Sequence, residues 1–290
     1  MSKILYVVTN IFHYTQERSV PVEQGELFFT INPYYVLDMS KMVNDIQFIT
    51  PDTQYIPWNE IYDSEWDTVI SSSFLGETIK CYRTMDIKKH ILVEDGMYDY
   101  IKRVEDEAYK SHCALYLSYP QYGYEPNNYA CISQLPDIPH CISNKITELY
   151  SESLQPLKHV PCSTPVLYTA PINHDYGICT EKEVEEMFNH TGISQLILKK
   201  HPRDSYQYNF PNIDVIECDQ QIPGQILFSQ FNGRHFFMFP STICLSKLYG
   251  TPEHGIKEII FFQDTNITDL NYINAFSVAS NIGAHIFNLN

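Results

Sequence analysis

Short apolar runs alternate with segments of helical character along the chain, and this alternation limits the fold more than any other feature. In the first half, strands are predicted at residues 3–9, 45–50, 68–73, 90–95 and 114–120. A helix is predicted between the first two strands, over residues 26–43, despite Pro33. Regular alternation of strands and helices is typical of α/β proteins with parallel sheets. The sequence therefore predicts an α/β fold.

A second series of strands follows a break in this pattern. Residues 151–165 lose the periodicity and contain three prolines, which indicates a linker. Beyond it, strands are predicted at 166–171, 196–200, 214–217, 235–240 and 258–262, and a helix at 181–190. We therefore expect two Rossmann-like domains facing each other across a cleft, over residues 1–155 and 156–268. A C-terminal helix, 269–290, is expected to pack back on the first domain.

The charge balance excludes several classes of partner. The 290 residues include 35 acidic and 19 basic side chains, which gives a formal net charge of −16. Nucleic-acid-binding proteins normally carry a basic surface, so no nucleic-acid partner is expected. No apolar run is long enough to span a bilayer, and the first residues, MSKILYVVTNIF, lack the features of a signal peptide. We expect a cytoplasmic protein, and peripheral association with the inner face of the membrane is compatible with this.

Common cofactor and metal motifs are missing from the sequence. The eight cysteines form no C-x-x-C pair, and neither they nor the eleven histidines have the spacing of zinc ligands. No D-x-D, G-x-x-x-x-G-K-[ST], G-x-G-x-x-G or G-x-S-x-G motif occurs. We therefore expect no metal site and no cofactor, and kinases, dehydrogenases and serine hydrolases are disfavoured.

An acidic pair followed by glycine stands at the end of a predicted buried strand. Glu94, Asp95 and Gly96 follow the apolar residues 91–93. Ligands of parallel α/β sheets bind outside the carboxyl ends of strands, where a carboxylate can act as a general base. Adjacent residues of an extended strand point to opposite faces, so only one of the two carboxylates can enter a cleft. A simple strand-terminating turn explains the same residues equally well.

Two further strand ends carry polar residues suited to an anion. Lys199, Lys200, His201 and Arg203 concentrate positive charge at the end of one strand, and a histidine beside cations can hold or protonate a phosphate. Ser241 and Thr242 follow another strand where a helix is predicted to begin, and free N–H groups there favour anions. The structural alternatives are a solvated turn for the first group and an ordinary N-cap for the second.

Taken together, the three motifs resemble those of bacterial sialyltransferases of the two-domain glycosyltransferase-B (GT-B) fold. That group includes lipooligosaccharide sialyltransferases and capsule polysialyltransferases. It shares an acidic pair with glycine, a His-Pro dipeptide and a Ser-Ser or Ser-Thr pair, in this order. In this chain they are Glu94-Asp95-Gly96, His201-Pro202 and Ser241-Thr242. The acidic motif falls in the first expected domain and the other two in the second, as in the family.

The resemblance implies a donor, an acceptor and roles for these residues. The donor substrate would be CMP-sialic acid, and the acceptor a terminal galactose-type hydroxyl of a bacterial surface glycan such as lipooligosaccharide or capsule. Asp95 would deprotonate the acceptor, with Glu94 and Gly96 in support, and transfer would invert the anomeric carbon without a metal. His201 would act on the departing phosphate as general acid or electrostatic clamp. The other phosphate contacts implied are Lys200, Pro202, Ser241 and Thr242.

Several alternatives stay open beside this interpretation. A CDP-glycerol-type glycerophosphotransferase shares the cytidine leaving group and would use a second histidine, for which His13 is the candidate. A polysialyltransferase or another CMP-sugar glycosyltransferase has the same motifs, although 19 basic residues limit a groove for a polyanion. A sugar-nucleotide epimerase and a non-enzymatic sugar-binding protein are further possibilities. Cytidine recognition is expected near residues 216–228, where Gln225 replaces an acidic residue of the family, and the oligomeric state is left open.

Overall fold

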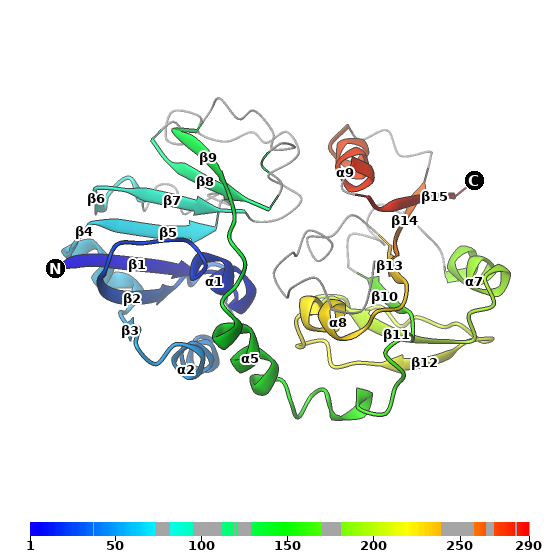
Figure 1. Cartoon of the computed structure of the whole chain (residues 1–290). Coiled ribbons are helices and arrows are strands. Elements are labelled where there is room, and N and C mark those ends of the chain that lie inside the picture. Colours follow the sequence, from blue (N-terminus) through cyan, green and yellow to red (C-terminus); the bar gives the residue numbers. More distant parts are fainter. Residues whose placement is uncertain are drawn as a thin grey trace. The chain divides into compact units, whose positions relative to one another are not determined.

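The chain was analysed as a computed structural model that describes most of its residues. The described ranges are 1–36, 38–72, 82–94, 112–118, 120, 129–169, 181–238, 258–264, 270–281 and 283–289. The chain divides into two compact units, Met1–Leu149 and Tyr150–Asn290. Each unit contains its own parallel sheet, so the expected α/β class is confirmed (Figure 1).

The first unit contains a sheet with Rossmann-like strand order. Its main strands run in the order β3-β2-β1-β5-β7-β8-β9, and all are parallel. The strands are β1 (Ser2–Val8), β2 (Gly25–Ile31), β3 (Gln54–Tyr55), β5 (Thr68–Ser72), β7 (His90–Val93), β8 (Ala114–Leu117) and β9 (Cys131–Gln134). The helices are α1 (Ile11–Glu17), α2 (Met39–Ile49), the 3₁₀ helix η1 (Trp58–Asp63) and α5 (His140–Leu149). A separate pair is formed by β4 (Glu65–Trp66) and β6 (Asp86–Ile87).

The second unit repeats this order. Its strands run β12-β11-β10-β13-β14-β15, again all parallel. They are β10 (Val166–Thr169), β11 (Gln195–Lys200), β12 (Asp214–Glu217), β13 (His235–Phe237), β14 (Ile259–Asp264) and β15 (His285–Leu289). The helices are the 3₁₀ helix η6 (Gln155–Leu157), α7 (Glu181–His190), α8 (Gly224–Gln230) and α9 (Leu270–Asn281). In both sheets, strands are added first on one side of the first strand (β1 or β10) and then on its other side. Doubly wound sheets bind ligands at this switch in strand order.

The central strands are buried because helices cover the sheets. In the first unit, α1 packs against β1, β5 and β7, and the rings of Tyr6 and Tyr14 meet edge to face with centroids 5.9 Å apart. In the second unit, Phe188 of α7 packs edge to face on Phe236 of β13 at 4.9 Å, and both side chains are fully buried. Strands that are covered on both faces have continuous apolar sequences. Such apolar runs are the pattern from which the strands are predicted.

One predicted strand and one predicted helix are wrong. Residues 45–50, expected as a strand, form the end of α2 and the residue after it, and the helix expected over 26–43 begins with β2 instead. The Asp38 carboxylate accepts a hydrogen bond from the backbone N–H of Lys41 at 2.9 Å and caps α2. Ile46 and Ile49 then fall on its buried face. The run Leu27–Ile31 pairs instead with β1, because apolar residues at successive positions suit a buried strand better than a one-sided helix.

The end of the chain also differs from the prediction of a helix over 269–290. The helix α9 ends at Asn281, and Gly283 adopts a φ of +98°, which strongly favours glycine. The chain then forms β15, which pairs with β14. Phe276 of α9 lies edge to face on Phe261 of β14 at 6.1 Å, so this helix contacts the second sheet. That it packs back on the first domain stays a prediction.

Within the described ranges, no helix has both the length and the apolar character needed to cross a membrane. In the same ranges, no three or more His, Cys, Asp or Glu side chains gather closely enough to hold a metal ion.

Replacing Gly233 by alanine should destabilise the second unit. A Cβ at this position would lie 2.3 Å from the carbonyl oxygen of Ser163, and a backbone atom cannot give way as a side chain can. We expect a loss of about 3 kcal/mol in the free energy of unfolding, at the upper end of overpacking effects. Urea denaturation measures it. Gly192→Ala is the control, since its Cβ would meet nothing within 4 Å and only the φ of +70° is strained. An equal loss in both variants would contradict the close approach.

Candidate functional site

Polar side chains gather at the carboxyl edge of the first sheet. Glu94 directly follows β7, Ser118 directly follows β8, and Gln134 ends β9. These three strands are neighbours in the sheet, and parallel strands bring their carboxyl ends to one edge. Gln16 of α1 reaches the same place, because α1 packs across β1, β5 and β7.

The Glu94 carboxylate is buried and hydrogen-bonded. Only 1% of the residue is exposed. One oxygen accepts a hydrogen bond from the backbone N–H of Ser118 at 2.8 Å, and the other from Gln16 Nε2 at 3.1 Å and from the Ser118 hydroxyl. Gln134 Nε2 in turn donates to the Ser118 carbonyl oxygen. We call Gln16, Glu94, Ser118 and Gln134 the edge network.

The edge network separates the roles that the sequence left open for the acidic pair. A carboxylate that already accepts three hydrogen bonds and is shielded from water is poorly placed to take a proton from a ligand. Glu94 is therefore poorly placed to be the general base, and its supporting role stays a prediction. Asp95 and Gly96 lie outside the described residues, so their roles stay predictions.

Glu17 is a second buried carboxyl group, one that the sequence did not single out. It is the last residue of α1 and is fully buried. Among the described residues, neither oxygen has a hydrogen-bond partner of good geometry, although the nearby backbone N–H of Ser72 favours the ionised form. Burial raises the pKa of Glu17 well above its ordinary value. The adjacent Gln16 Oε1 is also buried, and it has no partner within the described ranges.

His13 lies at the same edge, in the first turns after β1. Its Nδ1 atom is 2.8 Å from the Thr9 hydroxyl and 3.1 Å from Asn10 Nδ2. The amide NH₂ of Asn10 can only donate, so Nδ1 accepts and the neutral ring carries its proton on Nε2. Burial lowers the pKa of His13 to about 4. His13 is therefore neutral near pH 7, with its orientation fixed by its own loop.

In the second unit, the basic motif lies at the carboxyl end of β11. Lys199 and Lys200 are the last residues of this strand and are only 4% and 6% exposed, while His201 and Pro202 follow and are exposed. The Lys199 ammonium donates to the carbonyl oxygens of Gln220, at 3.0 Å, and Lys200. Burial lowers the pKa of Lys199.

Lys200 differs from its neighbour, because its ammonium has no counterpart in the part of the chain that the structure describes. Its register partner is Thr169 of β10, so the two side chains share a face of the sheet. No acceptor for its ammonium is found among the residues that the structure describes. A cation at the carboxyl end of a parallel strand makes this strand end suited to an anionic ligand.

Electrostatics at this edge favour a neutral His201. Although the residue is exposed by area, protein atoms around the ring reduce its hydration, and this lowers its pKa. The charges of Lys199 and Arg203 act in the same direction, and Asp204 opposes them. A neutral imidazole can donate one hydrogen bond and accept one.

The remaining predicted residues are only partly tested. Ser241 and Thr242 lie outside the described residues. Gln225, in the segment expected to bind cytidine, lies in the first turn of α8 and is 6% exposed. The sequence analysis missed Gln16, Glu17 and Ser118. Ser118 directly follows a strand, so the rule that selected Glu94 could have found it, whereas the burial of Glu17 depends on tertiary packing.

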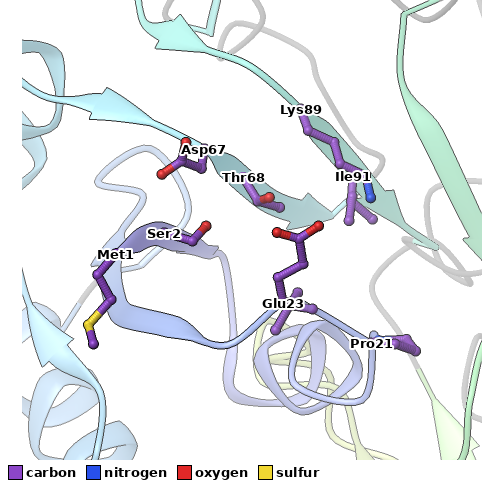
Figure 2. A pocket seen from close by; sticks show the side chains of 9 residues that line it. Met1, Ser2, Pro21, Glu23, Asp67, Thr68, Lys89 and Ile91 are labelled. Atoms are coloured by element: carbon purple, nitrogen blue, oxygen red, sulfur yellow. The ribbon is translucent and has the colours of Figure 1, made fainter.

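An open cavity lies at the opposite edge of the first sheet. It has a volume of about 650 Å³, and its lining includes Ser2, Thr68 and Ile91, at or near the starts of three strands (Figure 2). Glu23 and Lys89 also line it. Because ligands of parallel sheets bind at carboxyl ends, we assign one candidate site to each unit, at the edge network in the first and at the end of β11 in the second, rather than to this cavity.

Replacing Glu94 by glutamine should destabilise the first unit. The amide would present an NH₂ group to donors that now meet a carboxylate, and it would lose charge-assisted hydrogen bonds. We expect a loss of about 2 kcal/mol in the free energy of unfolding, measured by urea denaturation. Glu26→Gln on the exposed side of β2 is the control, with no measurable loss. An unchanged midpoint for Glu94→Gln would contradict the edge network.

Replacing Glu17 by glutamine should make the protein more stable toward alkaline pH. The folded state binds the Glu17 proton more tightly than the unfolded chain. Its stability contribution is therefore complete below the ordinary glutamic acid pKa and is lost as pH rises through the raised folded-state pKa. Glutamine removes this loss, which is at most about 1.4 kcal/mol per pH unit.

Urea denaturation of Glu17→Gln and the unchanged protein between pH 5 and 8 tests this. The stability difference should grow with pH, while His13 and His90, whose pKa values burial lowers to about 4 and about 3, contribute equally to both proteins. Glu26→Gln should show no such trend. If the free energy of unfolding changed with pH in the same way in Glu17→Gln and the unchanged protein, ionisation of Glu17 would not destabilise the folded state, and the prediction would be wrong.

Comparison with known proteins gives one distant relative. An uncharacterized protein of Haemophilus influenzae (strain Rd) is 25% identical to this chain over 163 residues, which cover 47% of this chain and 51% of that protein. The chain thus spans about half the length of the relative that it matches. No protein-family model matches the sequence. The name of the relative carries no activity, so any functional assignment depends on the residues themselves.

Proposed function

We propose that this protein is an inverting, metal-independent sialyltransferase. It would move sialic acid from CMP-sialic acid to a terminal galactose-type hydroxyl of a bacterial surface glycan. One observation carries the proposal: the acidic motif and the His-Pro motif both begin directly after buried strands, at the carboxyl ends of two parallel sheets with Rossmann-like order. The proposal includes a GT-B arrangement of the two units.

The proposed reaction moves one proton and exchanges one bond. Asp95 accepts the proton of the acceptor hydroxyl, whose oxygen forms a bond to the anomeric carbon of sialic acid. The bond from that carbon to the phosphate oxygen breaks, and the electron pair leaves with CMP. Glu94, held in the edge network, fixes the strand end from which Asp95 extends. Attack from the face opposite the leaving group inverts the anomeric centre.

The end of β11 provides the positive charge that an anionic donor requires. CMP-sialic acid carries a phosphate and a carboxylate, and the whole chain has a formal charge of −16. Lys200 supports the proposal because it places a cation at this strand end, with no counterion among the described residues. Pro202, Ser241 and Thr242 complete the phosphate contacts that we propose. In a low-dielectric site, fixed donors of this kind stabilise charge that develops on the leaving group.

A CDP-glycerol-type glycerophosphotransferase is the second candidate, favoured by one observation. His13, the additional histidine that such an enzyme would use, lies at the carboxyl edge of the first sheet. It is 9% exposed, however, and the pKa lowered to about 4 makes it a weak base. This favours the sialyltransferase over the glycerophosphotransferase. A polysialyltransferase would differ in making products longer than two sialic acids.

Replacing either proposed catalytic residue should reduce turnover. We expect His201→Ala and Asp95→Ala each to lower kcat by about 10²- to 10⁴-fold, the usual range for groups that handle a proton or a developing charge. Release of CMP from CMP-sialic acid with a galactose-terminated acceptor measures this. His190→Ala, at the exposed end of α7, is the control and should retain full turnover. Full turnover in both catalytic variants would refute the site.

Ligand-dependent thermal stabilisation should identify the donor. The panel comprises CMP, CMP-sialic acid, CMP-Kdo, CDP-glycerol and UDP-N-acetylglucosamine. A ligand present at about 100 times its Kd adds roughly 2.7 kcal/mol of stability. We expect CMP and CMP-sialic acid to raise Tm and the others to leave it unchanged. A shift with CDP-glycerol or the UDP-sugar, and none with CMP-sialic acid, would replace the proposed donor.

A further inference from the structure

The residues after β11 form a tight turn. The backbone N–H of Asp204 donates to the carbonyl oxygen of His201 at 2.8 Å, which closes a four-residue β-turn. Pro202 occupies its second position, where a fixed φ favours the turn. The backbone N–H of His201 donates to the carbonyl oxygen of Thr169 at 3.0 Å and so extends the pairing of β11 with β10. The backbone of His201 is thus fixed on both sides.

The same turn also fixes the His201 ring. The backbone N–H of Arg203 donates to His201 Nδ1 at 3.1 Å. An N–H group can only donate, so Nδ1 is the acceptor and the neutral ring carries its proton on Nε2. A proton added at Nδ1 would remove this hydrogen bond. The turn therefore favours one protonation state of His201 and leaves Nε2–H as the hydrogen-bond donor of the ring.

The buried side chain of Asp204 holds the turn in place through hydrogen bonds. The residue is only 2% exposed. Its Oδ2 accepts hydrogen bonds from the Thr169 hydroxyl at 2.6 Å and the Tyr208 hydroxyl at 2.9 Å, and its Oδ1 accepts one from the backbone N–H of Tyr206 at 3.1 Å. Its carbonyl oxygen accepts a further bond from Gln220 Nε2 at 2.9 Å. The position of the turn thus depends on Asp204 more than on any other described side chain.

We propose that Asp204 is a positioning residue, which holds the 201–204 turn so that His201 presents Nε2–H to an oxyanion as a neutral hydrogen-bond donor. The identity of that oxyanion as the CMP phosphate rests on the proposed function, whereas the fixed donor does not. His201 then stabilises the leaving phosphate as a hydrogen-bond donor and transfers no proton to it. This resolves the two roles that the sequence left open for His201.

The leaving group is compatible with such a donor. Cleavage releases CMP as a phosphate monoester, whose second pKa is about 6, so it departs near neutral pH without needing a proton. The described charges that act on the ring are those of Lys199, Arg203 and Asp204, and together with reduced hydration they lower the pKa of His201. A neutral N–H donor beside Lys200 stabilises the developing charge and does not have to be reprotonated in each cycle.

Nuclear magnetic resonance of the full chain with ¹⁵N-labelled histidine tests the proposal without donor or acceptor. His201→Gln assigns the His201 signals by their disappearance. Titration between pH 5 and 8 of the unchanged protein should show Nε2–H in the neutral ring and a pKa below that of free histidine. A ring protonated on Nδ1 would overturn the proposal. Since no substrate is present, a protein that transfers no sialic acid can still pass this test.

Two substitutions of Asp204 separate position from charge. Asp204→Asn and Asp204→Ala remove the same negative charge, but only asparagine can still accept from the Tyr206 N–H and keep the turn. Loss of charge alone lowers the pKa of His201 in both. Release of the ring in Asp204→Ala should raise it, so the alanine variant should titrate at higher pH than the asparagine variant. Equal values in the two variants would overturn the positioning role.

Thr169→Val provides a second route if Asp204→Ala does not fold. It keeps the carboxylate and removes one of its donors, so it should partly release the ring and shift the His201 pKa upward from its value in the unchanged protein. An unchanged pKa in folded Thr169→Val would count against the proposal. Asp214→Asn is the matched control. The Asp214 carboxylate lies at the amino end of β12, away from the 201–204 turn, and accepts a hydrogen bond from Gln195 Nε2. His201 should titrate in this variant as in the unchanged protein.

Discussion

The buried parallel strands confine useful polar chemistry to their ends. All four residues of β7 and of β10 are buried, and β11 is buried from Leu196 to Lys200. A charge in the middle of such a strand would lose its hydration without gaining partners. At the carboxyl end, neighbouring loops and the first turn of the next helix can supply those partners. This is why Glu94, Asp204 and the two lysines of β11 are at the sheet edges, and why each must be explained by what it contacts.

The two buried glutamates of the first unit show opposite solutions to the same cost. Glu94 is surrounded by donors, so its burial fixes the strand end and stabilises the fold. Glu17 has no donor of good geometry among the residues that the structure describes, and it lies at a helix C-terminus, where the helix dipole also disfavours negative charge. Both lie at the carboxyl edge, Glu17 beside Ser72 of β5 and Glu94 after β7. Stability alone does not require a carboxyl group at position 17. The buried carboxyl group of Glu17 therefore lowers the free energy of unfolding at this edge when it is ionised.

Much of the fold could be predicted from the sequence because buried strands are continuous apolar runs. The predicted strands at 90–95 and 214–217 contain the observed ones, the predicted strand at 196–200 lies within β11, and α7 spans the predicted residues. The exchange of β2 and α2 is not predicted, because the apolar run Leu27–Ile31 is grouped with the helical segment that follows it, and its pairing with β1 shows that it is a strand. The residues after strands identified Glu94, Lys200 and His201. They could not identify Gln16, Glu17 or Asp204, whose importance depends on contacts between segments distant in the chain.

His13 and His201, which lie at the carboxyl edges of the two sheets, are held in the same way: Nδ1 of each ring accepts a hydrogen bond from a nearby residue. In His13, Nδ1 accepts from Asn10 and Thr9 of the preceding loop, and in His201, Nδ1 accepts from the backbone N–H of Arg203 in the following turn. In both, a donor within four residues decides the tautomer, and in both the pKa is lowered. Local donors of this kind cost little conformational freedom, because the turn that supplies them is already ordered by the strand. Each ring therefore has its protonation state set by the loop itself, before any ligand arrives. An anionic ligand that reached either ring would meet an N–H donor that is already oriented and would not have to reorganise it.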